Sequence, residues 1–302
     1  MVKPPPRRYG ETKKISNIEQ RLMKSAADIT IDNPQDILFQ HTIICQTGLP
    51  YRNQKGLHRW KRHNGRVSLE IDAGRAFYPQ KKQYLNVPLP FGPKARLVLI
   101  HLNSEAIKTG SPAIEVEDSM TAFVKRLLKR NPNGREIKDF KNQLSALSAA
   151  TIRLAILADE RAVQINTNIV TAFDLWFPKN PNQRVLWPST VRLSHEYFDT
   201  LVKHAIPLDE RAIAALSHSA MALDIYVWLA QRLHRINLGN PQFIPWATLY
   251  EQFGQGFARI RKFREKFLSI LTKVKTQYPA ARIEADKGGL NLRQSLPPVP
   301  KR

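Results

Sequence analysis

The residues of this sequence most clearly suited to binding chemistry are the lysines and arginines concentrated near the C-terminal end, within residues 257–275. That stretch holds seven lysines and arginines and one acidic residue, Glu265. A solvated helix surface usually mixes the two signs of charge, and this stretch does not. Guanidinium and ammonium groups donate charge-assisted hydrogen bonds to phosphate oxygens. The pattern therefore favours contact with a polyanion over a merely solvated basic face.

The same stretch has an apolar face that would hold it against the rest of the protein. Its large apolar residues recur with helical periodicity at Ile260, Phe263, Phe267, Ile270 and Val274. The cations on the remaining surface that we expect to make contacts are Arg259, Arg261, Lys262, Arg264 and Lys266. Arginine can bind guanine through two hydrogen bonds and lysine mostly holds phosphates, but the pattern does not say which residue does which.

The charge of the whole chain points the same way. The 302 residues include 47 lysines and arginines against 25 acidic residues, a formal net charge of +22. Nucleic acid is the leading partner for such an excess, because cations that neutralise phosphates release condensed counterions. An acidic membrane surface is the other polyanion, but no run of about 18 apolar residues predicts a membrane-spanning helix. The first residues lack the apolar core of a signal peptide, so we expect a cytoplasmic protein with no membrane partner.

Sequence signatures of catalysis, cofactors and metals are absent. There is no G-x-x-x-x-G-K-[ST] or G-x-G-x-x-G loop for a nucleotide phosphate, and no H-E-x-x-H pair for zinc. The eight histidines are scattered, and the acidic residues form no dense cluster of the kind that a two-metal nuclease needs. The single cysteine, Cys45, lies in an apolar run and is expected to be buried. We therefore expect no catalytic residue, no cofactor and no metal site.

The N-terminal part is expected to contain an arm, a hairpin and a buried helix. Residues 1–33 are polar, basic and proline-led, which predicts a mostly disordered arm whose one candidate element is a short helix near Ser16 to Ala27. Asn64-Gly65, followed by alternating apolar residues, predicts a β-hairpin over 57–71, whose cations are candidate backbone contacts. The dense apolar run at 97–107 favours a helix.

The middle of the chain has the order of a helix-turn-helix followed by a hairpin. In chain order we expect a strand at 113–117, a helix capped by Asp118 or Ser119 that runs to Leu128, a turn, a long helix over 135–157, and a strand pair at 163–165 and 170–173. This is the order of a winged helix, a helix-turn-helix variant whose second helix reads the major groove. Its candidate contacts are Arg135, Lys138 and Lys141 on the long helix.

The C-terminal part repeats that order. The expected elements are a helix capped by Ser194, a long helix over 208–235, a short helix over 246–253, the turn Gly254-Gln-Gly256, the basic helix over 257–277, and a hairpin over 282–292. Lys287 lies at the tip of that hairpin and is a further candidate contact.

These elements predict a mainly α fold with short β-hairpins, of the α+β class, built as two tandem winged-helix domains. The expected divisions are a disordered basic arm at 1–33, an N-terminal winged-helix-like domain at 34–180, a C-terminal winged-helix DNA-binding domain at 181–295, and a proline-rich tail at 296–302.

Several short segments also form an ordered pattern along the chain. They are Gly48-Leu-Pro-Tyr-Arg52 and residues 93–103, 109–119, 173–178, 185–190, 207–213, 220–226, 243–246 and 251–254. No one of them is specific, but together they span about 45–295, and the pattern resembles the plasmid-encoded RepA replication-initiator family.

The resemblance implies a protein that binds repeated double-stranded DNA sites at a plasmid origin, helps to melt the adjacent duplex, and recruits the host replicative helicase and initiator. It also implies a monomer that binds the repeats, a homodimer that represses its own gene in copy control, and a place in the bacterial cytoplasm with the plasmid. We therefore expect a non-enzymatic replication initiator. A sequence-specific repressor without a replication role needs the same helices and stays an alternative, and a metal-dependent nicking enzyme is the least favoured.

Overall fold

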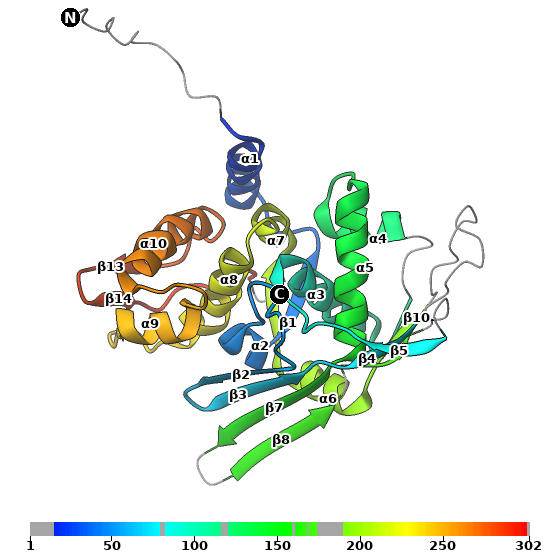
Figure 1. Cartoon of the computed structure of the whole chain (residues 1–302). Helices are drawn as coiled ribbons and strands as arrows, with labels where there is room; N and C mark the ends of the chain where they lie inside the picture. The colour runs from blue at the N-terminus through cyan, green and yellow to red at the C-terminus, as the bar shows by residue number, and fades with distance from the viewer. Residues whose placement is uncertain are drawn as a thin grey trace, which may run out of the picture.

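Two buried helices, α3 (Gly92–Thr109) and α8 (Ala220–Arg232), pack against each other at the centre of the fold (Figure 1). Most residues of both are buried, as expected for helices that are apolar on nearly every side. α3 confirms the predicted helix and ends at Gly110, whose φ of +65° is a left-handed conformation that glycine adopts without strain. The computed structural model describes residues 15–78, 82–115, 120–158, 161–167, 169–173 and 190–300.

A first group of elements surrounds α3, and we call it the first unit. After α3 it contains, in chain order, β6 (Ala113–Glu115), α4 (Met120–Leu128), α5 (Gly134–Ala149), β9 (Val170–Phe173) and β10 (Thr190–Leu193). The three strands form an antiparallel sheet in the order β6-β10-β9, and α4 packs on α5. The predicted caps of α4, Asp118 and Ser119, lie outside the described residues.

A second group surrounds α8, and we call it the second unit. After α8 it contains, in chain order, β12 (Gln242–Pro245), α9 (Trp246–Phe253), α10 (Ile260–Thr276), β13 (Ile283–Ala285) and β14 (Gly289–Leu292). Its antiparallel sheet has the order β12-β14-β13. Apart from two strands between α5 and β9, both units have the order helix, strand, helix, helix, strand, strand, and the last strand lies at the centre of the sheet. The sequence predicted the helix pair in each half, but it predicted neither β10 nor β12.

The chain between α5 and β9 differs from the expectation. α5 ends at Ala149 rather than near 157, and the next residues form the strand β7 (Thr151–Ala158), followed by β8 (Arg161–Thr167). β7 pairs with β3 (Val67–Asp72), a tertiary contact that the apolar periodicity of a single segment does not reveal. β8 pairs with β7 while β9 pairs with β10, so the predicted hairpin of 163–165 with 170–173 is wrong.

The hairpin predicted at Asn64-Gly65 is confirmed. β2 (Arg59–Asn64) pairs with β3, and Gly65 has a φ of +57° in the turn between them. With β7 and β8 these strands form a four-stranded sheet in the order β2-β3-β7-β8, against which α2 (Thr42–Thr47) packs. A separate small hairpin joins β4 (Arg75–Tyr78) to β5 (Gln83–Asn86).

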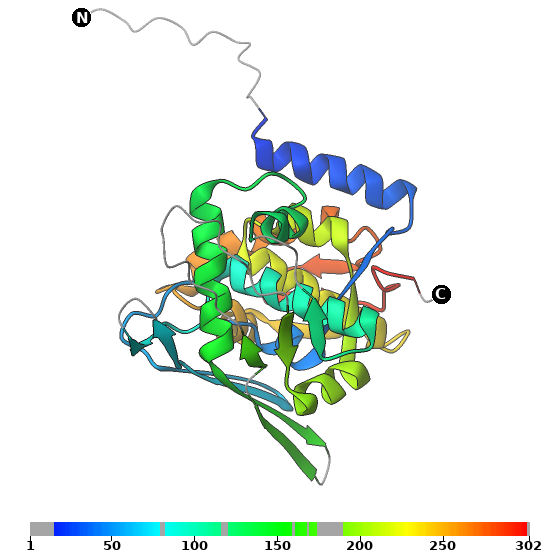
Figure 2. The same ribbon diagram turned by 90° about the vertical axis from the view of Figure 1, so that its right-hand side faces the viewer.

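The N-terminal region is more ordered than expected. α1 (Asn17–Ile31) is longer than the short helix considered there and lies along one end of the molecule (Figure 2). Ser16 and Glu19 form a capping box, and Gln277 Nε2 at the end of α10 donates a hydrogen bond to the Leu22 carbonyl over 2.9 Å. Residues 17–31 are therefore a docked helix rather than a disordered arm, and residues 1–14 lie outside the described residues.

The long helix expected at 208–235 is interrupted. β11 (Ala205–Asp209) pairs with β1 (Ile37–His41), α7 spans Glu210–Leu216, and α8 begins at Ala220. Asp209 and Ser219 each accept a hydrogen bond from a backbone N–H of the following helix, so each begins a new helix within one apolar pattern. α6 (His195–His204) begins after Ser194, as predicted.

Contacts join the two expected domains into one core. The expected boundary at 180 and 181 lies outside the described residues, yet β10 beyond it pairs with β6, and β11 pairs with β1. A buried ion pair also links α3 to α8, with Arg96 Nε 2.6 Å from Asp224 Oδ1. Among the described residues, no helix is long and apolar enough to cross a membrane.

Candidate nucleic-acid interface

α10 is anchored by its apolar face. Phe263, Phe267, Ile270 and Val274 are buried as the periodicity predicted, whereas Ile260, in the first turn, is 45% exposed. Phe263 and Phe267 belong to an aromatic cluster with side chains of α9 and the α9–α10 turn, and its ring centroids lie 5.3–5.9 Å apart: Trp246, Tyr250, Phe253 and Phe257. Close aromatic packing fixes the rotation of α10, so its opposite face is held toward solvent.

Four of the five predicted cations of this helix lie on that exposed face: Arg259, Arg261, Lys262 and Lys266. The Arg261 side chain is 85% exposed and the Lys262 side chain 68%. Both approach Glu265, with Arg261 Nε 3.3 Å from Oε1 and Lys262 Nζ 2.9 Å from Oε2, and these hydrogen bonds lower the pKa of that carboxyl. Exposed ion pairs stabilise a protein little, so the two cations can exchange Glu265 for a phosphate at small cost.

Arg264 has a different position from the other cations. Its guanidinium lies 5.0 Å from the ring centroid of Trp246 and donates hydrogen bonds to two carbonyls of the β13–β14 turn, those of Asp286 (3.1 Å) and Lys287 (3.2 Å). Trp246 Nε1 also donates to the Asp286 carbonyl over 3.1 Å. Arg264 therefore holds the hairpin against α9 and α10 rather than pointing freely outward.

The hairpin turn beyond Arg264 is itself built from specific contacts. Asp286 Oδ1 accepts hydrogen bonds from the backbone N–H groups of Gly288 (2.7 Å) and Gly289 (2.9 Å), which lower the pKa of its carboxyl. A Cβ on Gly289 would lie 2.1 Å from the Ile244 carbonyl oxygen, so only glycine fits there. Lys287 is exposed at the tip of this turn, as expected for a contact residue.

The predicted cations of the first unit lie at the start of α5. Arg135 and Lys138 are exposed and Lys141 is half-buried, while Phe140 and Leu144 face the core. Asn133 and Glu136 form a capping box, and Arg130 with the Asn133 backbone N–H lowers the pKa of Glu136 to about 2. The acidic side chains here have partners of their own, including Lys94 with Asp139 at 2.6 Å, so this surface mixes both charges more than that of α10.

Most of the remaining candidate contact residues bind carboxylates or carbonyls of the protein itself. In the β2–β3 hairpin, Arg59 Nε lies 2.6 Å from Asp72 Oδ1 and Lys61 Nζ lies 2.8 Å from Glu70 Oε2. Arg62 Nη1 donates to the carbonyl of Glu251 over 2.7 Å. Sequence reasoning passed over Arg52 and Lys55, which are exposed in the loop before this hairpin. The segment Gly48-Leu-Pro-Tyr-Arg52 was the one available signal for that loop.

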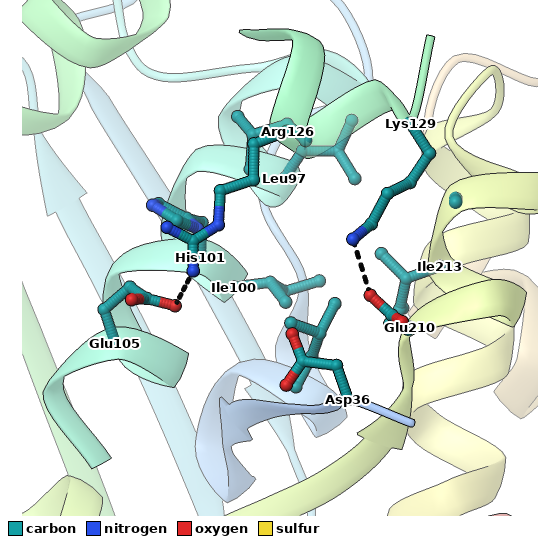
Figure 3. Close-up of a pocket in the computed structure, with 12 residues that line it drawn as sticks. Asp36, Leu97, Ile100, His101, Glu105, Arg126, Lys129, Glu210 and Ile213 are labelled. Carbon is teal, nitrogen blue, oxygen red and sulfur yellow. Dashed lines mark hydrogen bonds and ion pairs between the residues drawn. The ribbon is translucent and has the colours of Figure 1, made fainter. Parts of the chain in front are cut away.

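Few of the described side chains are suited to chemistry other than phosphate binding. Among the described residues, no group of three or more His, Cys, Asp and Glu side chains could hold a metal ion. Cys45 is buried, and burial raises the pKa of its thiol. A cavity of about 30 Å³ lies between α3, α4 and α7, bordered by His101, Ile213 and ion pairs (Figure 3). That volume suits about one water molecule rather than an organic ligand.

Comparison with solved structures identifies the fold. The crystal structure of selenomethionine derivatives of domain 2 and domain 3 of RctB superimposes with a TM-score of 0.51 and 10% sequence identity, covering 83% of this chain and 96% of that chain. A second structure, RctB domains 2–3, gives a TM-score of 0.49 at 10% identity and the same coverage. At such identity the likeness concerns the α+β fold alone, and no curated protein matches the chain.

The sequence itself supplies the family. A family model described as plasmid-encoded RepA protein matches residues 89–247, which is more than half of the chain. The matched residues run from the loop before α3 to the start of α9, so they include the whole first unit and the beginning of the second. This chain therefore belongs to the plasmid-encoded RepA protein family.

Proposed function

We propose that this protein is a plasmid replication initiator that binds repeated double-stranded DNA sites at an origin and catalyses no reaction itself. Membership of the plasmid-encoded RepA family supports a role in replication initiation. The observation that carries the DNA-binding part is α10, whose apolar face is buried while Arg259, Arg261, Lys262 and Lys266 stand exposed on the other side. A duplex offers the dense phosphates that such a face binds.

The order of elements in the two units supports binding to a duplex. Helix, strand, helix, helix and two further strands are the order of a winged helix, in which the second helix of the helix-turn-helix enters the major groove. On this proposal α5 and α10 are the recognition helices, and the hairpins β9–β10 and β13–β14 are the wings. Arg135 and Lys138 contact one half-site, and Arg261, Lys262 and Lys266 contact the other.

The other partners follow from the family rather than from a surface of this chain. We propose that the bound protein recruits the host replicative helicase and initiator in the cytoplasm of a plasmid-bearing bacterium. A homodimer would repress the protein's own gene and so contribute to copy control. The monomer would bind the origin repeats through both units.

The test is a nuclease footprint of the purified chain over the DNA upstream of its own gene, at 50 and 200 mM salt. We expect protection of direct repeats and an affinity that falls steeply with salt, because cations displace counterions from each contacted phosphate. The variant Arg261→Ala with Lys262→Ala should lose that protection. The control variant Lys203→Ala with Arg235→Ala removes the same charge from exposed sites on α6 and beyond α8, and should keep it.

A footprint of the double α10 variant equal to that of the unaltered chain would contradict the assignment of α10. Protection of a single palindrome at the promoter, without repeats, would favour the repressor without a replication role. Metal-dependent cleavage of supercoiled origin DNA by the pure protein would restore the nicking enzyme and end the proposal that no reaction is catalysed.

A further inference from the structure

We infer that the loop 51–56 is a third DNA-binding element, which lies between α5 and α10 and binds the phosphate backbone that connects their two half-sites. The inference rests on the proposed function, because it assumes that both helices contact one duplex. It assigns Arg52 and Lys55 to that surface as cations that hold phosphates.

The loop is placed between the two recognition helices. On one side, Arg52 and Gln54 line a groove of about 380 Å³ together with Phe257 and Lys266 of the second unit. Arg52 also shares a shallower groove with Lys262, Glu265, Lys266 and Ser269 on the exposed face of α10.

On the other side of the loop, Asn53 lines a groove of about 430 Å³ with Asp139 and Asn142 of α5. Asn142 follows Lys138 by one helical turn, so it lies on the same face of α5 as that cation. The loop thus lines one groove together with α5 and two grooves together with α10.

Hydrogen bonds from two elements hold the base of the loop. The Tyr51 backbone N–H donates to Gln255 Oε1 in the α9–α10 turn over 3.0 Å. The Pro50 carbonyl accepts from the Gly92 N–H (2.9 Å) and from Arg96 Nη1 (3.1 Å) at the start of α3. Arg96 in turn binds Asp224 of α8 through two hydrogen bonds of 2.6 and 2.7 Å. A loop so anchored loses little freedom on binding, which favours affinity.

This anchoring explains the segment Gly48-Leu-Pro-Tyr-Arg52. Gly48 has a φ of +69°, and a Cβ there would lie 2.6 Å from Asp224 Oδ2, inside the space that the carboxylate needs to reach Arg96. Gly56, with a φ of +78°, then closes a turn in which the Leu57 N–H donates to the Gln54 carbonyl over 3.0 Å. Residues 48–51 of the segment form a rigid support, and Arg52 at its end is its first exposed residue.

The two cations of the loop are available to bind phosphate. Arg52 and Lys55 are exposed, and neither side chain has an ion-pair partner among the described residues. The cations of the neighbouring hairpin differ, because Arg59 and Lys61 each pair with a carboxylate. Free cations between two recognition helices are suited to the continuous phosphate backbone of a duplex, since no internal contact has to be broken first.

The test compares two double variants on two lengths of DNA. The loop variant is Arg52→Ala with Lys55→Ala, and the matched control is Lys203→Ala with Arg235→Ala, which removes one lysine and one arginine elsewhere. One duplex of about 20 base pairs spans both half-sites and one of about 10 base pairs carries a single half-site. We expect the loop variant to bind the long duplex about tenfold more weakly than the control, with a salt slope smaller by about two. On the short duplex the two variants should bind alike.

Ethylation interference on the long duplex gives a second measurement. Ethylated phosphates between the half-sites should weaken binding of the unaltered chain and should have no effect on the loop variant. Equal binding of the long duplex by loop variant and control would overturn the inference and leave the proposed function standing, provided that Arg261→Ala with Lys262→Ala still abolishes binding. Equal losses on both duplexes would also overturn it, because the loop would then act within one half-site. Failure of the unaltered chain to bind any duplex would end both proposals.

Discussion

The two units share an order of elements but differ in the contacts that hold α10 to α9 and α4 to its neighbours. In the second unit, α9 meets α10 through the aromatic cluster of Trp246, Phe253, Phe263 and Phe267. In the first unit, α4 is tied to its neighbours partly by ion pairs around a small cavity, with Arg126 Nη2 3.0 Å from Glu105 Oε1 and Lys129 Nζ 2.7 Å from Glu210 Oε2 (Figure 3). Phe123 and Phe140 are also fully buried in the first unit, so its ion pairs add to an apolar core rather than replace one.

The contrast has consequences for the conditions under which each unit stays intact. Burial of aromatic surface involves no charge that salt can screen or acid can titrate, whereas partly exposed ion pairs are screened by salt. The first unit also buries His101 beside Phe123, with ring centroids 5.2 Å apart. We therefore expect acid and salt to loosen the first unit while the second, which contains the more cationic helix α10, is retained.

The largest expected effect is that of removing an aromatic ring from the second unit. Phe267→Ala should lower the free energy of unfolding by about 3–5 kcal/mol, because it leaves a cavity in a fully buried cluster. Urea denaturation of the variant measures this, and DNA binding should be lost with the position of α10. Phe243→Ala, at a half-exposed ring, is the control and should change stability by less than about 0.5 kcal/mol. A loss under about 1 kcal/mol for Phe267→Ala would contradict the role given to the cluster.

The next effect is the dependence of stability on acid. Burial lowers the pKa of His101 to about 3, with nearby Arg126 contributing, and burial lowers that of His41 to about 3 as well. Both values lie below the unfolded value of about 6.5, so this stability is complete above pH 6.5 and is lost as the pH falls toward 3. At pH 5.5 the two residues together should cost about 3 kcal/mol of unfolding free energy.

Urea denaturation at pH 7.5 and 5.5 checks that dependence, and His101→Gln should remove about half of it. Near-ultraviolet signals from the second unit's tryptophans should persist at pH 5.5 while amides of α4 exchange faster. Simultaneous loss of both signals would contradict the expected difference between the units.

A smaller effect on stability should distinguish Arg264 from Arg261, two arginines of α10 with different contacts. Arg264→Ala should lower the free energy of unfolding by about 1–2 kcal/mol, because it removes two hydrogen bonds to the hairpin and the contact with Trp246. Arg261→Ala should leave stability within about 0.5 kcal/mol of the unaltered chain and weaken DNA binding instead. Thermal unfolding and DNA titration of both variants test this. Equal stabilities of the two variants would show that Arg264 does not hold the hairpin.

The smallest expected effect is the coupling between Arg126 and Glu105. Because the arginine is partly exposed, a double-mutant cycle with alanine at both positions should give a coupling of about 0.5–1 kcal/mol at 20 mM salt. The coupling should shrink toward zero at 1 M salt. A coupling that is unchanged at high salt would mean that packing, rather than charge, holds α4.

Local signals predicted some elements within a few residues. The sequence predicted α9, the glycine turn after it, α10 and the 282–292 hairpin from apolar periodicity and the positions of glycines. Both signals depend only on residues a few positions apart in the chain. The end of α5 and the break between α7 and α8 were missed. In the first case pairing of β7 with β3 favours a strand over a continued helix, and in the second two capping side chains interrupt an apolar run. Neither outcome is visible in a short window of sequence.

For the candidate interface, composition and periodicity were enough to identify α10 as cationic on one side and apolar on the other, and the ordered segments were enough to indicate the RepA family. These properties depend on residue type and helical spacing alone. The direction of each long cationic side chain depends on neighbours that are distant in sequence. Folding turns Arg264 toward the Asp286–Lys287 backbone and leaves Arg261 exposed beside Glu265. It also sets Arg52 beside α10, through the hydrogen bonds of Tyr51 with Gln255 and of Arg96 with Asp224.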